Sequence, residues 1–155
     1  MFKTVHFRKL IGSLVITLGT GIFSALLSGN LAENYGTFVK PPLSPPGWIF
    51  GPVWTVLFIL MGISLYFVRT TPGTHTKETG IFYLQLFFNF FWSILFFRFG
   101  LYCFSAWWLA FLILLVGYTI YLFYRVKPLA GGLLIPYLLW CLFAHYLNIG
   151  VCVLN

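Results

Sequence analysis

The side chains of this protein that could take part in chemistry are few, and carboxylates are the scarcest. Glu33 and Glu78 are the only acidic residues among 155, against nine Lys and Arg. Hydrolysis by paired carboxylates and metal sites made of oxygen ligands both need several carboxylates, so we expect neither. The basic residues are dispersed between long apolar runs and form no stripe that could follow a phosphate backbone. Nucleic acid is therefore not an expected partner.

The three cysteines do not form a recognisable site. Cys103, Cys141 and Cys152 are odd in number, far apart and without CxxC spacing, so we predict no disulfide framework and no zinc site, and expect all three to be buried apolar side chains. Cys141 and His145 are four residues apart and could share a helix face. This pair could supply an axial haem or metal ligand, or His145 could be a hydrogen-bonded core residue. Because no second pair completes a site, we favour the core histidine and predict no metal.

Polar and aromatic side chains inside apolar segments are the stronger candidates, because a polar group is costly at membrane depth. At helical spacing they form three stripes, each on one helix face. The stripes are Trp54 and Phe58; Gln85, Asn89, Trp92 and Phe96, with Ser93 beside them; and Tyr137, Trp140, Ala144 and Asn148.

The three stripes have two interpretations. Amides such as Gln85 and Asn89 could simply form interhelical hydrogen bonds, worth about 0.6 kcal/mol on average in membranes. Tryptophans near helix ends, namely Trp48, Trp107 and Trp108, match the belt at the membrane surface, whereas Trp54, Trp92 and Trp140 lie deeper. If the stripes face one another, they line an aromatic cavity with few polar groups, which is typical of a site for a flat hydrophobic ligand.

The elements that must position these residues are membrane helices. The chain is 61% hydrophobic and only 7% charged, which excludes a water-soluble globular protein. Its apolar stretches predict an all-α, integral membrane five-helix transmembrane bundle, one domain over residues 1–155, because each stretch approaches the ~20 residues that cross a bilayer. The expected spans are about 10–28, 48–68, 80–98, 101–125 and 128–150. The first could instead be a signal peptide, but its apolar run exceeds the usual 7 to 15 residues, so we expect a retained span.

The orientation follows from the basic residues between the spans. Seven of them fall on the side of the N-terminus and two, Lys40 and Arg98, on the other. The positive-inside rule then places the N-terminus in the cytoplasm and the C-terminus outside. Residues 29–47 form the one long connection, on the outer side. Its four prolines, Pro41, Pro42, Pro45 and Pro46, predict a stiff segment that could act as a lid.

Three segments resemble a known family, the tryptophan-rich sensory protein/translocator protein (TspO) family, formerly called peripheral benzodiazepine receptors. They are KPPLSPPGWIFGPVWT at 40–55, LFFNFFWSILFF at 86–97 and LLIPYLLWCLFAHYLN at 133–148. They occur in the family's order, and the resemblance covers essentially the whole chain.

The resemblance implies a five-helix protein of the bacterial cell membrane, often a homodimer, with a ligand cavity beneath the first loop. It implies binding of tetrapyrroles such as protoporphyrin IX and haem, and in some members of sterols and synthetic benzodiazepine-type drugs, with no required cofactor. The ligand-binding positions that it implies are Tyr35, Trp54, Phe58, Asn89, Ser93, Phe96, Trp140, Ala144 and Asn148.

The chain departs from the family pattern at several of these sites. Asn34 and Leu43 stand where the family often has Trp, and Phe58 stands where Tyr is common. No Lys or Arg follows Tyr146, so the motif proposed for cholesterol is incomplete, which argues against sterol binding.

Three functions remain open on the sequence. The protein could be a membrane receptor or sensor that binds a porphyrin. It could be an enzyme that degrades porphyrin with light and oxygen, with Trp54 and Trp140 as candidate electron donors. It could also carry porphyrin or sterol passively, whereas coupled transport is disfavoured because no charged residue lies inside a span.

Overall fold

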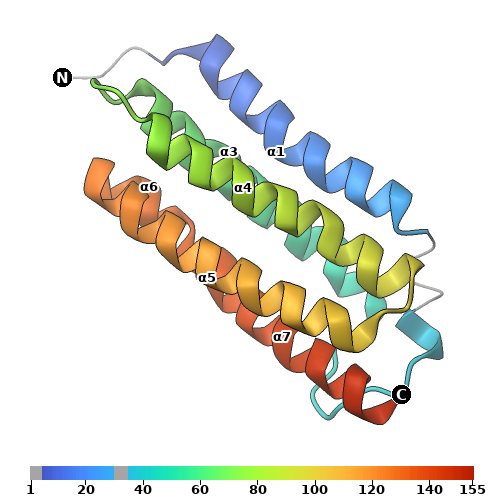
Figure 1. Cartoon of the computed structure of the whole chain (residues 1–155). Helices are drawn as coiled ribbons and strands as arrows, with labels where there is room; N and C mark the ends of the chain where they lie inside the picture. The colour runs from blue at the N-terminus through green and yellow to red at the C-terminus, as the bar shows by residue number, and fades with distance from the viewer. Residues whose placement is uncertain (1–4, 30–34) are drawn as a thin grey trace.

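The computed structural model describes residues 5–29 and 35–155 and is a bundle of helices (Figure 1). Throughout those two ranges there is no strand, so the all-α prediction is confirmed. The long helices are α1 (Phe7–Leu27), α3 (Phe50–Thr70), α4 (Thr76–Ser93), α5 (Tyr102–Val126) and α7 (Ile135–Leu154), and the short ones are η1 (Gly47–Ile49), η2 (Ile94–Arg98) and α6 (Pro128–Leu133).

Five helical segments of the described chain are long and apolar enough to cross a membrane. They are Phe7–Leu27, Gly47–Thr70, Thr76–Arg98, Tyr102–Val126 and Pro128–Leu154. Each contains most of one predicted span, and the stretch for which a signal peptide was the alternative forms α1 of the bundle. The protein is therefore an integral membrane protein with a five-helix bundle.

The helices pack closely where small side chains meet. In the α1–α3 contact, Thr17 Oγ1 donates to the carbonyl oxygen of Phe58 at 2.8 Å. A Cβ on Gly62 would lie 2.7 Å from the Leu14 side chain, and one on Gly21 would lie 2.5 Å from the Phe58 ring. Small residues thus let the backbones of α1 and α3 approach each other.

Short turns reverse the chain between the long helices. After α4, the π-helical segment η2 leads to Gly100, whose φ of 63° is the left-handed conformation that glycine adopts without strain. The last predicted span, 128–150, is two helices, because α6 ends at Leu133 and α7 begins at Ile135. Pro136 lies in the first turn of α7, where its missing N–H costs least. Because the chain crosses the bundle five times, α1 begins at one end of the bundle and α7 ends at the other (Figure 1).

The long connection, described from residue 35 onward, lies against the C-terminal end of α7. Asn155 makes two hydrogen bonds to Val39, from the Val39 N–H to Oδ1 at 3.1 Å and from Nδ2 to the Val39 carbonyl oxygen at 2.8 Å. Tyr146 Oη donates to the carbonyl oxygen of Pro42 at 2.6 Å. A Cβ on Gly150 would lie 2.4 Å from Pro41, so only glycine permits this contact. The described part of the loop is thus fastened to α7.

The prediction that no disulfide forms was wrong. Cys103, at the start of α5, is bonded to Cys152, near the end of α7, with their Cα atoms 4.9 Å apart. The sequence separation of 49 residues hid the pair, because two antiparallel helices bring these positions together. Neither residue is fully buried, contrary to expectation, whereas Cys141 is a free, buried thiol as expected.

Candidate functional site

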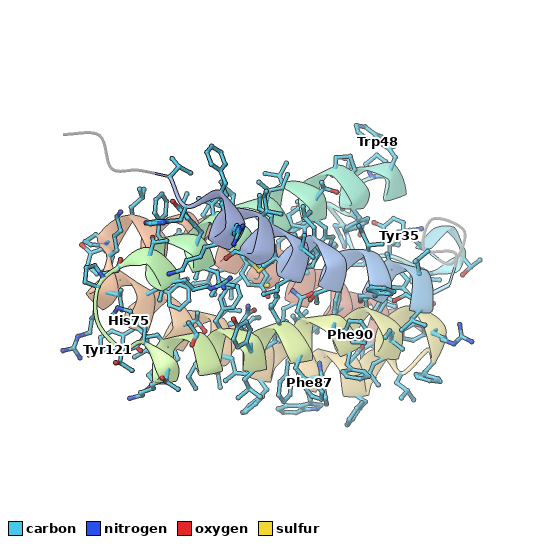
Figure 2. The ribbon with its side chains drawn as sticks, turned by 90° about the horizontal axis from the view of Figure 1, so that it is seen from above. Tyr35, Trp48, His75, Phe87, Phe90 and Tyr121 are labelled. Carbon is cyan, nitrogen blue, oxygen red and sulfur yellow. A yellow bond between two sulfur atoms is a disulfide. The ribbon has the colours of Figure 1, made fainter. Side chains whose placement is uncertain are left out.

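The bundle encloses a cavity of about 430 Å³ near the end that carries the long loop. Its walls come from α1, α3, α4 and its π-helical extension η2, and α7, with residues of the loop also lining it. Figure 2 shows the two labelled residues of this region, Tyr35 and Trp48, at one end of the bundle and His75 and Tyr121 at the other. The site is therefore asymmetric along the membrane-crossing direction.

Eight of the nine predicted ligand-binding residues line this cavity. They are Tyr35, Trp54, Phe58, Asn89, Ser93, Phe96, Ala144 and Asn148. The three helical stripes thus meet in space at a single cavity.

Trp140, the ninth, is not part of the cavity wall. Its ring lies 5.9 Å from that of Phe50, which does line the cavity, so Trp140 packs against a residue of the wall. The Trp140 indole nitrogen is buried and has no hydrogen-bond partner among the described residues. The structure therefore does not bring Trp140 together with the other eight residues at the cavity wall.

Aromatic rings form most of one side of the cavity. Trp54 lies 6.2 Å from Trp92 and 5.7 Å from Phe58, and Trp92 is stacked on Phe96 at 5.8 Å. Ring pairs at these distances attract one another beyond their burial alone. The wall is therefore packed in place before any ligand arrives.

Hydrogen bonds fix two polar residues of the wall. Trp92 Nε1 donates to Oδ1 of Asn148 at 2.9 Å, and Nδ2 of Asn148 donates to the Tyr102 carbonyl oxygen at 2.7 Å. This pair joins α4 to α7 and α7 to the start of α5. The indole of Trp92 is thereby oriented with its ring along the cavity wall.

A second polar chain runs from the cavity into the core. Nδ2 of Asn89 donates to Tyr137 Oη at 2.7 Å, and Tyr137 Oη donates to Oε1 of Gln85 at 2.7 Å. Gln85 is buried and does not line the cavity, so it follows the interhelical interpretation of the buried amides. Asn89 fits both interpretations, because it bonds across helices and also lines the wall.

The loop closes the cavity through Tyr35. Its Oη donates to the carbonyl oxygen of Pro45 at 2.6 Å, and its ring lies 4.9 Å from that of Phe50. Burial raises the pKa of the Tyr35 hydroxyl above its usual value. The neighbouring Asn34, a departure from the family pattern, lies outside the described residues, and Leu43 is 85% exposed and away from the cavity.

Sequence reasoning missed the contribution of α1 and of the loop cation. Gly21 and Ala25 recur with Ser13, Thr17 and Gly29 at every fourth residue, a pattern that predicts only helix packing, yet both also line the cavity. Trp48, assigned to the membrane-surface belt, lines it too, as does Lys40. The unused signal was the position of Lys40, the one basic residue directly before the proline segment.

The cavity also has a side opening. Ile22 and Ala25 on α1, and Gly51 and Thr55 on α3, line the cavity and are exposed. In a membrane-spanning helix such a surface faces lipid. The cavity is thus open between α1 and α3 towards the bilayer.

The chemistry available at the wall is limited. No described residue that lines it is acidic, a histidine or a cysteine, and the titratable side chains there are Tyr35 and Lys40, both from the loop. The ring nitrogen Nε2 of His145 lies 3.1 Å from the Ala106 carbonyl oxygen, away from the wall. Within the described ranges, no three His, Cys, Asp or Glu residues cluster as metal ligands would. The arrangement is suited to burying and stacking a flat apolar molecule.

The chain matches known proteins over most of its length. A family model described as the TspO/MBR family matches residues 13–154. The chain is 35% identical to the tryptophan-rich protein TspO of Archaeoglobus fulgidus over 97% of this chain and 99% of that one, and 42% identical to the protein of the same name from Chlorobaculum tepidum over 78% of each. It is 34% identical to the human translocator protein over 88% of this chain and 83% of that one. On these matches over nearly its whole length, the chain belongs to the TspO/MBR family.

Proposed function

We propose that this protein is a membrane receptor or sensor that binds porphyrins, such as protoporphyrin IX or haem, and related hydrophobic ligands in the cavity beneath the loop. The observation that carries the proposal is the aromatic cavity of about 430 Å³, which lies in the 300–1,000 Å³ range of small-molecule sites. A relative from Cereibacter sphaeroides, 31% identical over 79% of this chain, is named tryptophan-rich sensory protein, which supports the sensory role.

The wall offers enough apolar contact for tight binding. Trp54, Trp92 and Phe96 present adjacent rings, and each aromatic side chain can contribute on the order of 150–250 Å² of buried area. A micromolar dissociation constant corresponds to a binding free energy of about 8 kcal/mol. Contacts of this extent can supply it even after the loss of translational and rotational freedom on binding. Benzodiazepine-type drugs are further candidate ligands by the same reasoning. We also propose that the protein forms a homodimer, as the family resemblance implies.

The test is a titration with protoporphyrin IX in lipid nanodiscs, with tryptophan quenching as the signal. Ala144→Phe places a ring inside the cavity, because Ala144 is buried and lines it. Leu114→Phe adds the same ring at a side chain that is 71% exposed and away from the cavity. We expect Ala144→Phe to weaken binding at least tenfold and Leu114→Phe to bind like the wild type, with thermal melting showing that both variants fold. Equal affinities for the two variants would contradict binding in this cavity.

Degradation of the bound porphyrin is the second candidate function. The indole of Trp54 lies in the cavity wall 6.2 Å from that of Trp92, so a photoexcited ligand stacked there would have an oxidisable ring beside it. Oxygen would be the oxidant, and no acid or base would be needed. Passive carriage is the third, and the side opening between α1 and α3 is the observation in its favour.

We also propose that the N-terminus is cytoplasmic, that the C-terminus lies outside, and that the membrane is a bacterial cell membrane. The distribution of Lys and Arg supports this orientation. The disulfide between Cys103 and Cys152 lies at the end of the bundle that the orientation places outside, where disulfides persist. A cysteine-reactive label that cannot cross membranes, applied to intact cells after reduction, should therefore reach these two cysteines.

A further inference from the structure

Most polar groups in the cavity wall already donate to the protein itself. The Tyr35 hydroxyl donates to Pro45, the Ser44 hydroxyl to the Pro41 carbonyl oxygen at 2.7 Å, and the Ser24 hydroxyl to the Phe90 carbonyl oxygen at 2.7 Å. Asn148 donates to Tyr102. A ligand in the body of the cavity therefore meets mainly apolar surface.

Lys40 is the exception, at the loop end of the cavity. It is the one charged side chain among the described residues that line the cavity. Its Nζ lies 4.9 Å from the centre of the Tyr35 ring and 3.3 Å from the Phe38 carbonyl oxygen. An ammonium group has three donors and these contacts are long, so Lys40 keeps the capacity to bind an anion. Its partial burial strengthens such an interaction relative to an exposed pair.

The cavity is thus polarised along its length, with aromatic and aliphatic walls in its body and a cation at its loop end. We infer that Lys40 binds a carboxylate of the ligand, so that the preferred ligand is a flat apolar molecule with an anionic carboxylate at one edge. This inference rests on the proposed function and deepens it. It places the carboxylate edge at the loop and the apolar edge towards Asn89 and Trp92, which line the wall on α4.

The test compares a porphyrin dicarboxylate with its dimethyl ester, which has the same ring but no charge. Both are titrated in nanodiscs of zwitterionic lipid against the wild type, Lys40→Met and Lys40→Arg. The control is Lys77→Met, which removes a cation near the start of α4, outside the cavity. Dividing the acid-to-ester affinity ratio of each variant by that of the wild type cancels the different partitioning of the two ligands into lipid.

We expect the acid-to-ester affinity ratio to fall about fivefold in Lys40→Met, a change between the value for an exposed ion pair and that for a buried charged hydrogen bond. The ratio should stay at the wild-type value in Lys40→Arg and Lys77→Met. A ratio in Lys40→Met equal to that of the wild type overturns the role of Lys40 and leaves porphyrin binding intact. If neither ligand binds the wild type, the proposed function fails and this inference fails with it.

Discussion

At the scale of single residues, substitutions of Trp54 and Trp140 distinguish ligand binding from light-dependent degradation of the ligand. Trp54 lines the cavity, whereas Trp140 does not and packs against Phe50. If Trp54 only stacks on the ligand, Trp54→Phe keeps most of the apolar area and should weaken affinity by about 1 kcal/mol. If the indole donates an electron, phenylalanine cannot replace it, and photoproduct formation should collapse even when the cavity is saturated with ligand. Affinity and photoproduct yield are measured on the same illuminated sample, with dark and ligand-only controls.

Trp140→Phe is the matched comparison, because it changes an indole of the same helix bundle that does not line the cavity. It should leave affinity near the wild-type value. A photoproduct that survives in Trp54→Phe at full occupancy would show that Trp54 stacks on the ligand and is not its electron donor.

Tyr35 gives the loop a pH dependence. Burial raises the pKa of its hydroxyl, so the folded loop favours the neutral phenol that donates to Pro45. This contribution to loop closure is complete below the ordinary tyrosine pKa of about 10 and is lost as the pH rises through the raised value. We therefore expect ligand dissociation to accelerate at alkaline pH in the wild type. In Tyr35→Phe, ligand dissociation should already be about fivefold faster at pH 7, because the variant lacks about one hydrogen bond. Its rate should then show no increase at alkaline pH from ionisation of residue 35.

Stopped-flow dissociation from pH 7 to 11 measures this effect. Tyr121→Phe, at the other end of the bundle, is the control for general tyrosine ionisation. Because the Lys40 ammonium lies over the Tyr35 ring, Lys40→Met is measured alongside. An alkaline step of the same size in Tyr35→Phe would show that another group opens the loop.

At the scale of elements, the disulfide connects the loop to the rest of the bundle through α7. The end of α7 holds the loop by the bonds of Asn155 and Tyr146, and the bond between Cys103 and Cys152 ties that end to α5. Removing the disulfide with Cys103→Ser/Cys152→Ser should lower the stability by about 2–4 kcal/mol. It should also speed ligand dissociation, because the loop loses a fixed support.

Thermal melting and dissociation rates check this expectation. A dithiol reductant should change the wild type in the same direction and leave the double variant unaltered, although the free thiol of Cys141 is present in both. Unchanged dissociation in the double variant, with lowered stability, would show that the disulfide supports the bundle but not the loop.

At the scale of the whole molecule, the sequence predicts those features of the fold and of the cavity that are set within a single helix. The five spans follow from continuous apolar runs, and the stripes that carry Trp54, Asn89 and Asn148 follow from helical spacing. The pairing of Cys103 with Cys152 and the absence of Trp140 from the cavity wall depend on how helices pack together, which no spacing rule contains. The repeat of small residues on α1 predicts helix packing, whereas its second role at the cavity appears only once α3 is in place.

The arrangement of α1 against α3 also predicts how a ligand enters. The cavity opens between these helices at side chains that face lipid, so a hydrophobic ligand dissolved in the bilayer can reach it without passing the loop. Ala25→Trp should obstruct the opening, since Ala25 lines the cavity and is exposed. Raising the barrier by about 1.4 kcal/mol would slow association and dissociation tenfold together. Leu26→Trp, one residue further along α1 at a side chain that is 70% exposed and outside the cavity wall, is the control. Rates that are the same in both variants would place entry at the loop instead, where Tyr35 and its bond to Pro45 would then control access.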